Sequence, residues 1–379
     1  MNNTKEYVVL LCGYAGANIS GGDEHALQLI SYLNNAGNIV KVILPADAYR
    51  ERLNAEVERI NIPNLPFESR FRGIKSLLLF CYLWRIAFAW FVLRRLSVSG
   101  AQIVVAASHL FHDVLPLSFQ KKRGSIFVYA YHLINFCHTR KGVAAQISAF
   151  LERISIRAMA ACNANIITSS SVVRTQLLSM LPQKIGDIFL SRNGVDLNIL
   201  QAVPAQEKKI EIVFCGRFVE HKGVCDLLRA ISYIPLERRG NVVLIGRGPD
   251  LNKILKLREE LELNCVRIVT DADDFEKFRL MKSAKIFVLP SYEEGWGIVI
   301  GEALACGIKV IAYEIEEIHS IWGDSVIWIE RGNIQKLATG IQGLMAHGEI
   351  GEADAEYWQS ALSWEMILQA ESCYFDSKQ

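Results

Sequence analysis

The sequence predicts an α/β protein built from two domains, each with a parallel β-sheet covered by helices. Short β-branched apolar runs alternate with segments of helical periodicity, a pattern typical of parallel sheets. This pattern restarts after the polar stretch 201–209, and 379 residues are enough for two full cores. Ligands of such sheets bind outside the carboxyl ends of the strands. We therefore expect two Rossmann-like domains that face each other across a cleft.

The first predicted domain comprises residues 1–205. A helix is expected over Asp23–Asn34, where Leu27, Ile30 and Leu33 fall on one side. The apolar runs that predict buried parallel strands are Tyr7–Cys12, Val40–Leu44, Ile103–Ala107, Ile126–Tyr131 and Ile166–Ser169.

The second predicted domain comprises residues 206–359. Helices are expected at Val224–Ser232 and Leu251–Leu261, between strands of a second sheet. Residues 353–379 are predicted to be helical, and a helix at about 360–379 is a candidate to pack back onto the first domain. The strands predicted for this domain are Ile210–Cys215, Val242–Ile245, Val266–Val269, Ile286–Leu289 and Lys309–Ala312.

Charge and cysteine content narrow the class of protein. Residues 1–205 contain 21 Lys and Arg against 12 Asp and Glu, whereas the remainder contains 20 against 28. A basic first half indicates an anionic surface or acceptor, although ordinary surface variation between domains explains the asymmetry as well. The nine cysteines have no metal-ligand or disulfide spacing, and the N-terminus lacks signal-peptide features. We therefore expect a cytoplasmic protein.

One apolar segment, 77–93, raises the question of a membrane. It is too short for a comfortable span and carries Arg85 near its centre, so a transmembrane helix is not predicted. Two alternatives stay open: a buried domain helix, or an interfacial helix through which residues 70–95 contact an anionic membrane. The basic residues that flank the segment are Arg70, Arg72, Lys75, Arg94 and Arg95.

The most informative block runs from Leu289 to Gly307. Glu294 and Glu302 lie eight positions apart, with a Gly-Trp-Gly turn at 295–297 between them. The order strand, glycine loop, helix exposes backbone N–H groups at a helix start, where an anion is favoured. Carboxylates can accept hydrogen bonds from sugar hydroxyls. The block therefore predicts a site for a sugar joined to a nucleoside diphosphate.

Two cations and a histidine strengthen this prediction. Arg217 and Lys222 follow the predicted strand Ile210–Cys215, where they can neutralise a diphosphate leaving group. Taken alone, Arg217 and Lys222 favour an ordinary solvated loop. His132 follows the strand Ile126–Tyr131, so it is expected at a strand end that faces the cleft; the alternative is a structural histidine.

Several separate motifs give the chain a family resemblance. They are Gly21-Gly-Asp-Glu24, Asn193-Gly-Val-Asp196, Cys215-Gly-Arg-Phe-Val-Glu-His-Lys-Gly223, Leu244-Ile-Gly-Arg-Gly-Pro249 and the Glu294–Glu302 block. With them the chain resembles the retaining glycosyltransferases of GT-B fold in family 4, the glycosyl transferases group 1.

The resemblance implies a role for each matching position. Glu294 and His132 are the expected catalytic residues near the transferred sugar, and Glu302 is expected to bind the ribose. Gly246 and Arg247 are expected beside the nucleoside, and Gly21 and Asn193 on the acceptor side. The residues expected at the donor diphosphate are Arg217, Lys222, Gly22, Gly295, Trp296, Gly297 and Ile298.

The predicted activity is the retaining transfer of a hexosyl group from a nucleotide-diphosphate sugar to a hydroxyl acceptor, with a lipid-linked or polysaccharide precursor as one candidate. The alternatives are an epimerase or phosphorylase of the same fold, or a non-catalytic nucleotide-sugar binder. No metal is expected, because His109 and His112 lack further ligands and the Asp271-Ala-Asp273 stretch is interpreted as a helix-capping loop. No other cofactor and no nucleic acid is expected either. Base, sugar, acceptor and oligomeric state stay open.

Overall fold

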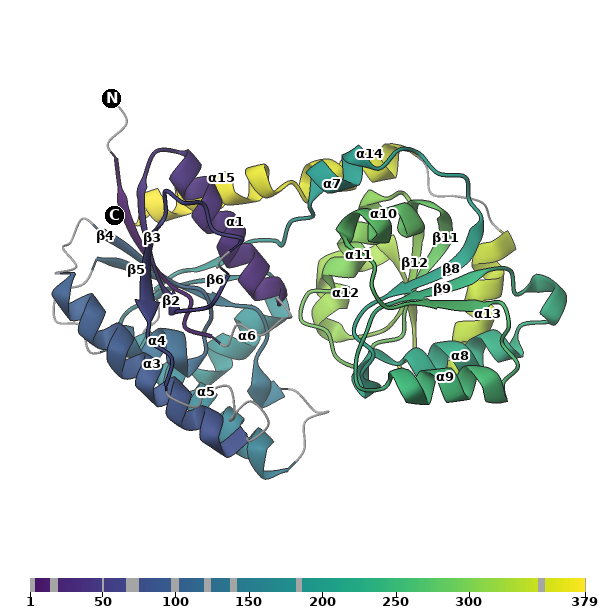
Figure 1. Ribbon diagram of the computed structural model, residues 1–379, viewed down its shortest axis with the longest axis horizontal. Coiled ribbons are helices and arrows are strands. Elements are labelled where there is room, and N and C mark those ends of the chain that lie inside the picture. Colours follow the sequence, from purple (N-terminus) through teal and green to yellow (C-terminus); the bar gives the residue numbers. More distant parts are fainter. Residues whose placement is uncertain are drawn as a thin grey trace. The chain divides into compact units, whose positions relative to one another are not determined.

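The computed structural model describes residues 4–13, 20–49, 51–65, 75–96, 102–118, 124–136, 142–181, 186–346 and 352–378. The chain divides into two compact units (Figure 1). The first unit contains Met1–Asn193 together with Ile367–Gln379, and the second contains Gly194–Met366. Each unit has a hydrophobic core of its own.

Seven parallel strands form the sheet of the first unit, in the order β3-β2-β1-β4-β5-β6-β7. The sequence predicts five of these strands. It misses β3 and β7, which lie at the two sheet edges and are only partly buried. β3 has no continuous apolar run, and the apolar run of β7 is only three residues long. The strands are β1 (Glu6–Leu10), β2 (Ile39–Pro45), β3 (Glu58–Ile62), β4 (Gln102–Ala106), β5 (Ser125–Ala130), β6 (Asn165–Thr168) and β7 (Ile188–Leu190).

Helices join and cover these strands. The start of α1 is fixed by a capping box, in which Ser20 Oγ accepts from Asp23 N and the Asp23 carboxylate accepts from Ser20 N. The described helices are α1 (Gly21–Asn35), α3 (Lys75–Arg95), α4 (Phe111–Ser118), α5 (Val143–Ala161), α6 (Ser171–Met180) and α15 (Trp364–Ser377), with the short η1 (Ile134–Phe136).

The apolar segment 77–93 forms most of α3, and this helix is partly buried and partly exposed. Its inner side packs Ile86, Ala89 and Leu93 into the first core. Its outer side exposes large apolar residues, Phe80, Leu83, Trp84 and Phe91. Within the described ranges, no helix has both the length and the apolar character needed to cross a bilayer. Arg70 and Arg72 lie outside the described residues.

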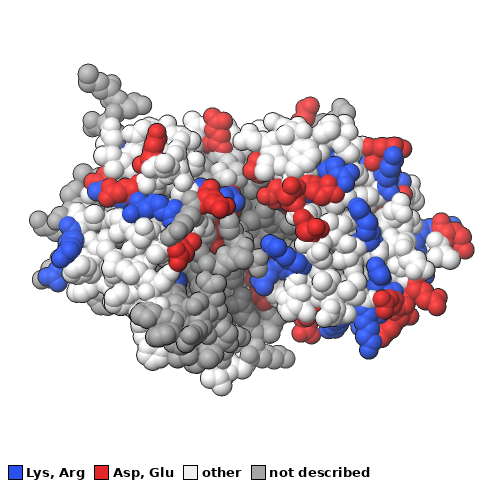
Figure 2. Space-filling view, in the orientation of Figure 1, with Lys and Arg blue, Asp and Glu red and all other residues white. Residues whose placement is uncertain are grey.

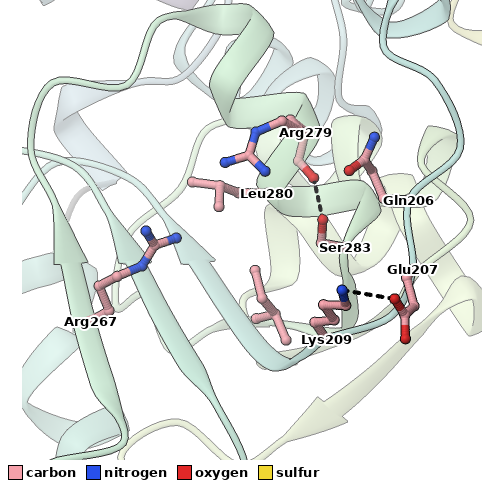
Figure 3. Close-up of a pocket in the computed structure, with 8 residues that line it drawn as sticks. Gln206, Glu207, Lys209, Arg267, Arg279, Leu280 and Ser283 are labelled. Carbon is pink, nitrogen blue, oxygen red and sulfur yellow. Dashed lines mark hydrogen bonds and ion pairs between the residues drawn. The ribbon is translucent and has the colours of Figure 1, made fainter.

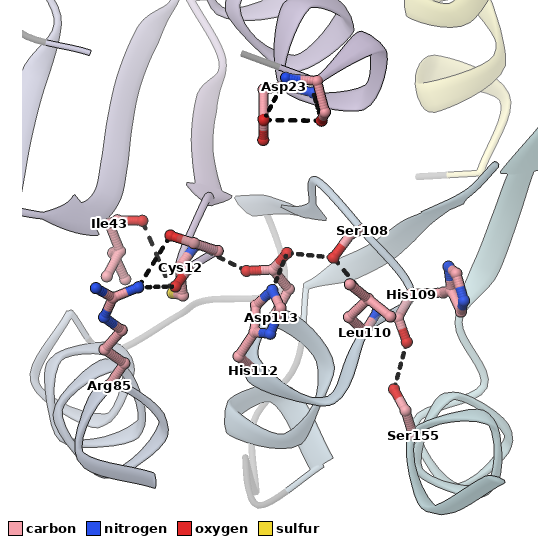
Figure 4. Close-up of polar contacts among 12 residues, drawn as sticks. Cys12, Asp23, Ile43, Arg85, Ser108, His109, Leu110, His112, Asp113 and Ser155 are labelled. Atoms are coloured by element: carbon pink, nitrogen blue, oxygen red, sulfur yellow. Dashed lines mark hydrogen bonds and ion pairs between the residues drawn. The ribbon is translucent and has the colours of Figure 1, made fainter. Parts of the chain in front are cut away.

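A buried polar cluster ties α3 and α4 to the end of β1 (Figure 4). Asp113 Oδ1 accepts from Cys12 N at 2.7 Å, and Asp113 Oδ2 accepts from Ser108 Oγ at 2.6 Å. Burial raises the pKa of Asp113 to about 7, although these hydrogen bonds oppose the rise. Arg85 Nη1 donates to the carbonyl oxygens of Cys12 at 3.1 Å and Gly13 at 3.0 Å. These contacts explain why the central arginine of the apolar segment is retained: it fixes the chain where β1 ends.

A second buried network fixes α15 to the first unit. Glu371 is fully buried and accepts hydrogen bonds from the hydroxyls of Tyr129 and Ser191. His25 Nε2 lies 3.0 Å from Glu371 Oε1, and His25 Nδ1 lies 2.9 Å from Asn193 Oδ1. Burial lowers the pKa of His25, but the Glu371 carboxylate outweighs it and the net pKa is raised. The C-terminal helix is thus held by a buried ion pair.

Six parallel strands form the sheet of the second unit, in the order β10-β9-β8-β11-β12-β13. The sequence predicts five of them and misses β13, an edge strand with only one fully buried residue. The strands are β8 (Ile210–Cys215), β9 (Val242–Ile245), β10 (Val266–Val269), β11 (Ala284–Leu289), β12 (Lys309–Tyr313) and β13 (Val326–Ile329).

The second sheet is covered by helices that include both predicted ones. Asp273 caps α10, as the sequence predicts, because its carboxylate accepts from Glu276 N at 2.7 Å. The helices are α7 (Leu197–Ala202), α8 (Val224–Tyr233), α9 (Leu251–Glu260), α10 (Asp274–Lys282), α11 (Ile298–Ala305), α12 (Glu316–Trp322), α13 (Ile334–Ala346) and α14 (Glu352–Ala361), with the short η2 (Glu220–Lys222), η3 (Leu236–Arg238) and η4 (Gly323–Ser325).

The change of unit lies at Asn193, not at the predicted residue 205. The reason is that the chain after Asn193 already packs into the second core through Leu200 and Val203. In the same segment Val195 N donates to Leu362 O at 2.9 Å, and α7 packs against α10. The proline-containing stretch after 201 is therefore a loop inside the second unit.

Candidate active site

The loops that follow β8 and β11 meet at the carboxyl edge of the second sheet. These two strands are neighbours, and Tyr292 N donates to His221 O at 2.7 Å to join the loops. Gly223 makes the approach possible. It has a φ of 66°, and a Cβ there would lie 1.9 Å from Pro290 O, so no other residue fits. The sequence-predicted groups Lys222 and Glu294 are carried on these two loops.

Lys222 and Glu294 form an ion pair. Lys222 Nζ lies 2.6 Å from Glu294 Oε1, and Ser291 Oγ donates to the same oxygen at 2.8 Å. The Glu294 side chain is only 9% exposed and that of Lys222 is 19% exposed. A phosphate at Lys222 must therefore share the ammonium with Glu294 or displace it. Sequence reasoning identified both residues but not their pairing, and it missed Ser291.

A buried aspartate anchors the loop around Glu294. Asp226 on α8 accepts hydrogen bonds from Tyr292 at 2.6 Å and from Tyr313 at 3.2 Å. Burial and the nearby carboxylate raise the pKa of Tyr292 to about 12, so the phenol stays a donor. This anchor gives the Glu294 loop a defined position.

Arg217 lies at the exposed side of the same loop. Its guanidinium makes no hydrogen bond or ion pair within the part of the chain that the structure describes. Gly246 and Arg247 follow β9 and lie against this loop, since Phe218 N donates to Arg247 O at 3.0 Å. A Cβ on Gly246 would lie 1.9 Å from Gly216 O, so Gly246 is needed for close packing of the two loops. Its nearness to a nucleoside stays a prediction.

The predicted glycine turn leads into the start of α11. Gly297 is the N-cap residue with a φ of 73°, and no side chain caps the helix. The N–H groups at its first turn, including that of Ile298, can therefore meet an anion. Trp296 is 4% exposed and its ring packs on Trp322, and its contact with a donor stays a prediction. Gly295 is half-buried in the same turn.

Glu302 lies one turn into α11 and is paired with a residue that the sequence analysis missed. Lys277 Nζ on α10 lies 2.7 Å from Glu302 Oε1. Glu302 Oε2 is buried and has no hydrogen-bond partner among the described residues. Lys277 is 25 positions from Glu302 in the sequence, and no spacing rule links them. An unfilled carboxylate oxygen fits the predicted binding of a sugar hydroxyl.

The first unit places its predicted residues differently. Gly21 and Gly22 open α1, and a Cβ on Gly22 would lie 2.8 Å from the Tyr131 ring, so this glycine serves packing. His132 lies two residues beyond the end of β5 and is half-buried, and its role stays a prediction. Asn193 is 2% exposed with its side chain against His25, so it helps to hold α15 and its side chain has no open face for an acceptor.

Basic and acidic side chains are interspersed on the visible face of the second unit (Figure 2). Many basic residues of the first half, for example 121–123 and 140–141, lie outside the described ranges, so the predicted basic surface is not described. No group of three or more His, Cys, Asp or Glu side chains suited to a metal ion occurs among the described residues. His109 instead contacts Glu152 at 2.9 Å.

A pocket of about 350 Å³ lies at the amino ends of the strands of the second sheet, where β8 begins (Figure 3). Two of its cations are already engaged, because Arg279 pairs with Glu276 and Lys209 with Glu207. None of the residues predicted for the donor lines this pocket. Ligands of parallel sheets bind at the carboxyl ends of the strands, so the pocket is not the candidate site.

Comparisons with known proteins agree with this geometry. An uncharacterised glycosyltransferase of Methanocaldococcus jannaschii is 23% identical over 94% of this chain and 95% of its own length. Sucrose-phosphate synthase of Thermosynechococcus elongatus superposes with a TM-score of 0.76 at 19% identity, covering 98% of each chain. The Anabaena protein HepE, solved in complex with UDP and glucose, has a TM-score of 0.69 at 15% identity and covers 98% of this chain and all of its own.

Residues 196–359 match the sequence model of one family, glycosyl transferases group 1. The match covers the strands and loops that carry Lys222, Glu294 and Glu302. The second unit is therefore similar to the glycosyl transferases group 1, and the two units have the GT-B fold.

Proposed function

We propose that this chain transfers a hexosyl group from a nucleoside-diphosphate sugar to a hydroxyl acceptor with retention of the anomeric configuration. The observation that supports it best is the meeting of the Lys222–Glu294 pair with the uncapped start of α11. The site thus offers a cation and free backbone N–H groups to an anion, beside a carboxylate for hydroxyls. A sugar diphosphate has both kinds of group in one molecule.

The chemistry proposed needs little covalent work from the protein. The bond from the anomeric carbon to the diphosphate oxygen breaks, and its electron pair leaves with the diphosphate. The acceptor oxygen bonds to the same face of that carbon and gives its proton to a leaving phosphate oxygen. Lys222, Arg217 and the N–H groups of α11 stabilise the charge that grows on the leaving group, without a metal ion. Glu294 stabilises positive character at the anomeric carbon.

A thermal-shift panel of nucleoside diphosphates and their sugars tests the donor part of this proposal. At 100 times its Kd a ligand stabilises the folded state by about 2.7 kcal/mol. For a domain of this size that raises Tm by roughly 5–10 °C. We expect one nucleoside diphosphate to produce such a shift, and the corresponding nucleoside to produce none. If all members of the panel leave Tm unchanged, the proposed donor class is wrong.

The acceptor is proposed to be a lipid-linked saccharide at the cytoplasmic face of a membrane. This part rests on the exposed apolar side of α3, Phe80, Leu83, Trp84 and Phe91, next to the basic end of the helix at Arg94 and Arg95. Helix α5 adds the exposed Val143, Ile147 and Phe150, and both helices pack on α4. Apolar and aromatic residues beside cations fit an anionic bilayer surface.

Flotation with liposomes tests the membrane contact. We expect the protein to float with vesicles that contain phosphatidylglycerol and to bind phosphatidylcholine vesicles less. The triple variant Phe80→Ser, Leu83→Ser, Phe91→Ser should lose at least ~10-fold in binding, because each apolar side chain gains roughly 1.5–3 kcal/mol on full burial. The control Tyr233→Ser, Leu236→Ser alters exposed apolar residues of the second unit and should float like wild type. Wild-type protein that stays at the bottom of the gradient would contradict the contact.

A further inference from the structure

Glu302 is a buried acid with one satisfied and one unsatisfied oxygen. Its side chain is only 11% exposed, which makes an ionised carboxylate costly unless a partner is present. Oε1 accepts from Lys277 Nζ at 2.7 Å, whereas Oε2 has no partner among the described residues. A carboxylate has about four acceptor positions, so one ammonium leaves most of them available.

Lys277 is itself held in place by several contacts. Its Nζ lies 2.9 Å from Asp274 Oδ1 on the same helix and 4.6 Å from the centre of the Phe278 ring. Burial lowers the pKa of Lys277, but its interactions with Glu302 and other neighbours, Asp274 among them, together outweigh burial and the net pKa is raised. Lys277 is therefore a fixed cation, and its side chain is 15% exposed.

Within the described residues, no second cation forms a salt bridge with the Glu302 carboxylate. The titratable neighbours are thiols: burial first, and Glu302 second, raise the pKa of Cys215 and of Cys306 to about 12. Both thiols are neutral between pH 6 and 8. Asp274 also pairs with Lys277, and its side chain is 62% exposed. Lys277 is thus the cation that the described contacts bring to Glu302.

We propose that Lys277 is a positioning residue that turns and holds Glu302 for the ribose hydroxyls of the donor. This inference rests on the proposed donor function and adds a selectivity to it. Because the ammonium takes Oε1, the remaining acceptor positions of the carboxylate are kept for hydroxyls. The site then favours ribonucleoside diphosphates over their 2′-deoxy forms, through a residue that touches Glu302 and not the sugar.

Matched nucleotide pairs test the inference. Binding of UDP and dUDP, GDP and dGDP, and ADP and dADP is measured on the full chain by calorimetry. For the pair that binds, wild type should prefer the ribose form by roughly 10–100-fold, the value of one or two hydrogen bonds to a charged group. In Lys277→Met this preference should fall to within about 3-fold, mainly because the ribose form binds more weakly. A merely structural role of Lys277 would weaken both forms equally and keep the ratio, and that result would overturn the proposal.

A second substitution of the same lysine gives a second readout. Lys277→Gln keeps a donor for Oε1 without the charge, so it should retain part of the ribose preference that Lys277→Met loses. It also serves as the test if the methionine variant does not fold. An equal ribose preference in wild type, Lys277→Gln and Lys277→Met counts against the proposal.

Two further variants complete the design. Lys285→Met removes another ion pair of the second unit, in which Lys285 Nζ lies 2.9 Å from Glu211 Oε1, and it should behave like wild type. Glu302→Gln should lose the ribose preference on its own, and adding Lys277→Met should cost less than 2-fold more. If wild type binds none of the six nucleotides, the donor function itself fails. If it binds them but the variants keep the ratio, only the inference about Lys277 fails.

Discussion

Replacing Lys222 by alanine is expected to lower kcat/KM for sugar transfer by ~10²–10³-fold, the usual effect of removing one preorganised group that stabilises transition-state charge. Lys222 Nζ lies 2.6 Å from Glu294, on the loop that also carries Arg217. Its ammonium opposes the negative charge that grows on the departing diphosphate. Because that charge is larger in the transition state than in the bound donor, the loss should fall mainly on kcat. Initial rates with the donor found by thermal shift measure the effect.

The control for Lys222 is Lys256→Ala. Lys256 is an exposed lysine of α9 that pairs with Glu260 at 3.6 Å on the surface of the same unit, and its removal should change the rate by less than 2-fold. Thermal melting of each variant separates loss of chemistry from loss of fold. A non-catalytic binder would have no rate to lose. A Lys222→Ala enzyme within about 5-fold of wild type would remove the charge-stabilising role from this lysine.

The second large effect concerns stability. Glu371→Ala should destabilise the first unit by about 3–5 kcal/mol, because removing one member of a buried ion pair leaves the other uncompensated. Glu371 is fully buried, lies 3.0 Å from His25, and accepts the hydroxyls of Tyr129 and Ser191. Urea unfolding, monitored by hydrogen exchange in both units, measures the change in the free energy of unfolding. The exchange of β8 and β11 in the second unit should be unaffected.

The destabilisation should depend on pH in a defined direction. The pKa of His25 is raised in the folded protein by Glu371, so the pair contributes fully below the unfolded-state pKa of histidine, about 6.5. That contribution is lost as pH rises through the raised folded-state pKa. The difference between wild type and Glu371→Ala should therefore be larger at pH 6 than at pH 9. Asp376 lies on the same helix as Glu371 and forms an exposed salt bridge with Lys5. Asp376→Ala should lower the free energy of unfolding by less than about 1 kcal/mol. Equal effects of the two variants would show that the buried network does not hold α15.

The sequence predicts the sheets well where burial is continuous. Strands such as β8 and β11 are almost wholly buried, so their apolar runs are readily recognised. The missed strands β3, β7 and β13 all lie at sheet edges and are only partly buried. β3 has no continuous apolar run, and those of β7 and β13 are three and four residues long. The predicted boundary at residue 205 differs from the observed one at Asn193, because a polar stretch with a proline indicates a loop and does not show where the chain enters another core. Which core buries Leu200 and Val203 is a tertiary fact.

The candidate site shows the same division. Lys222, Glu294 and the glycine turn at 295–297 could be predicted because they follow strands that are neighbours in one sheet. The pairing of Lys277 with Glu302 could not, since it joins two helices that no sequence spacing relates. Trp296 was assigned to the donor from its place in the loop, yet packing against Trp322 turns its side chain into the core. Residues beside a motif share its backbone position but not its side-chain direction.

The second unit is proposed to bind a nucleoside diphosphate at the carboxyl edge of β8 and β11. A crystal structure with the best-binding nucleoside diphosphate is the decisive test. We expect phosphate oxygens within hydrogen-bond distance of Lys222 Nζ and of the first N–H groups of α11, with the ribose against Glu302. It would be contradicted by a nucleotide bound elsewhere, for instance in the pocket lined by Arg267 and Arg279, while Lys222 stays paired with Glu294 alone.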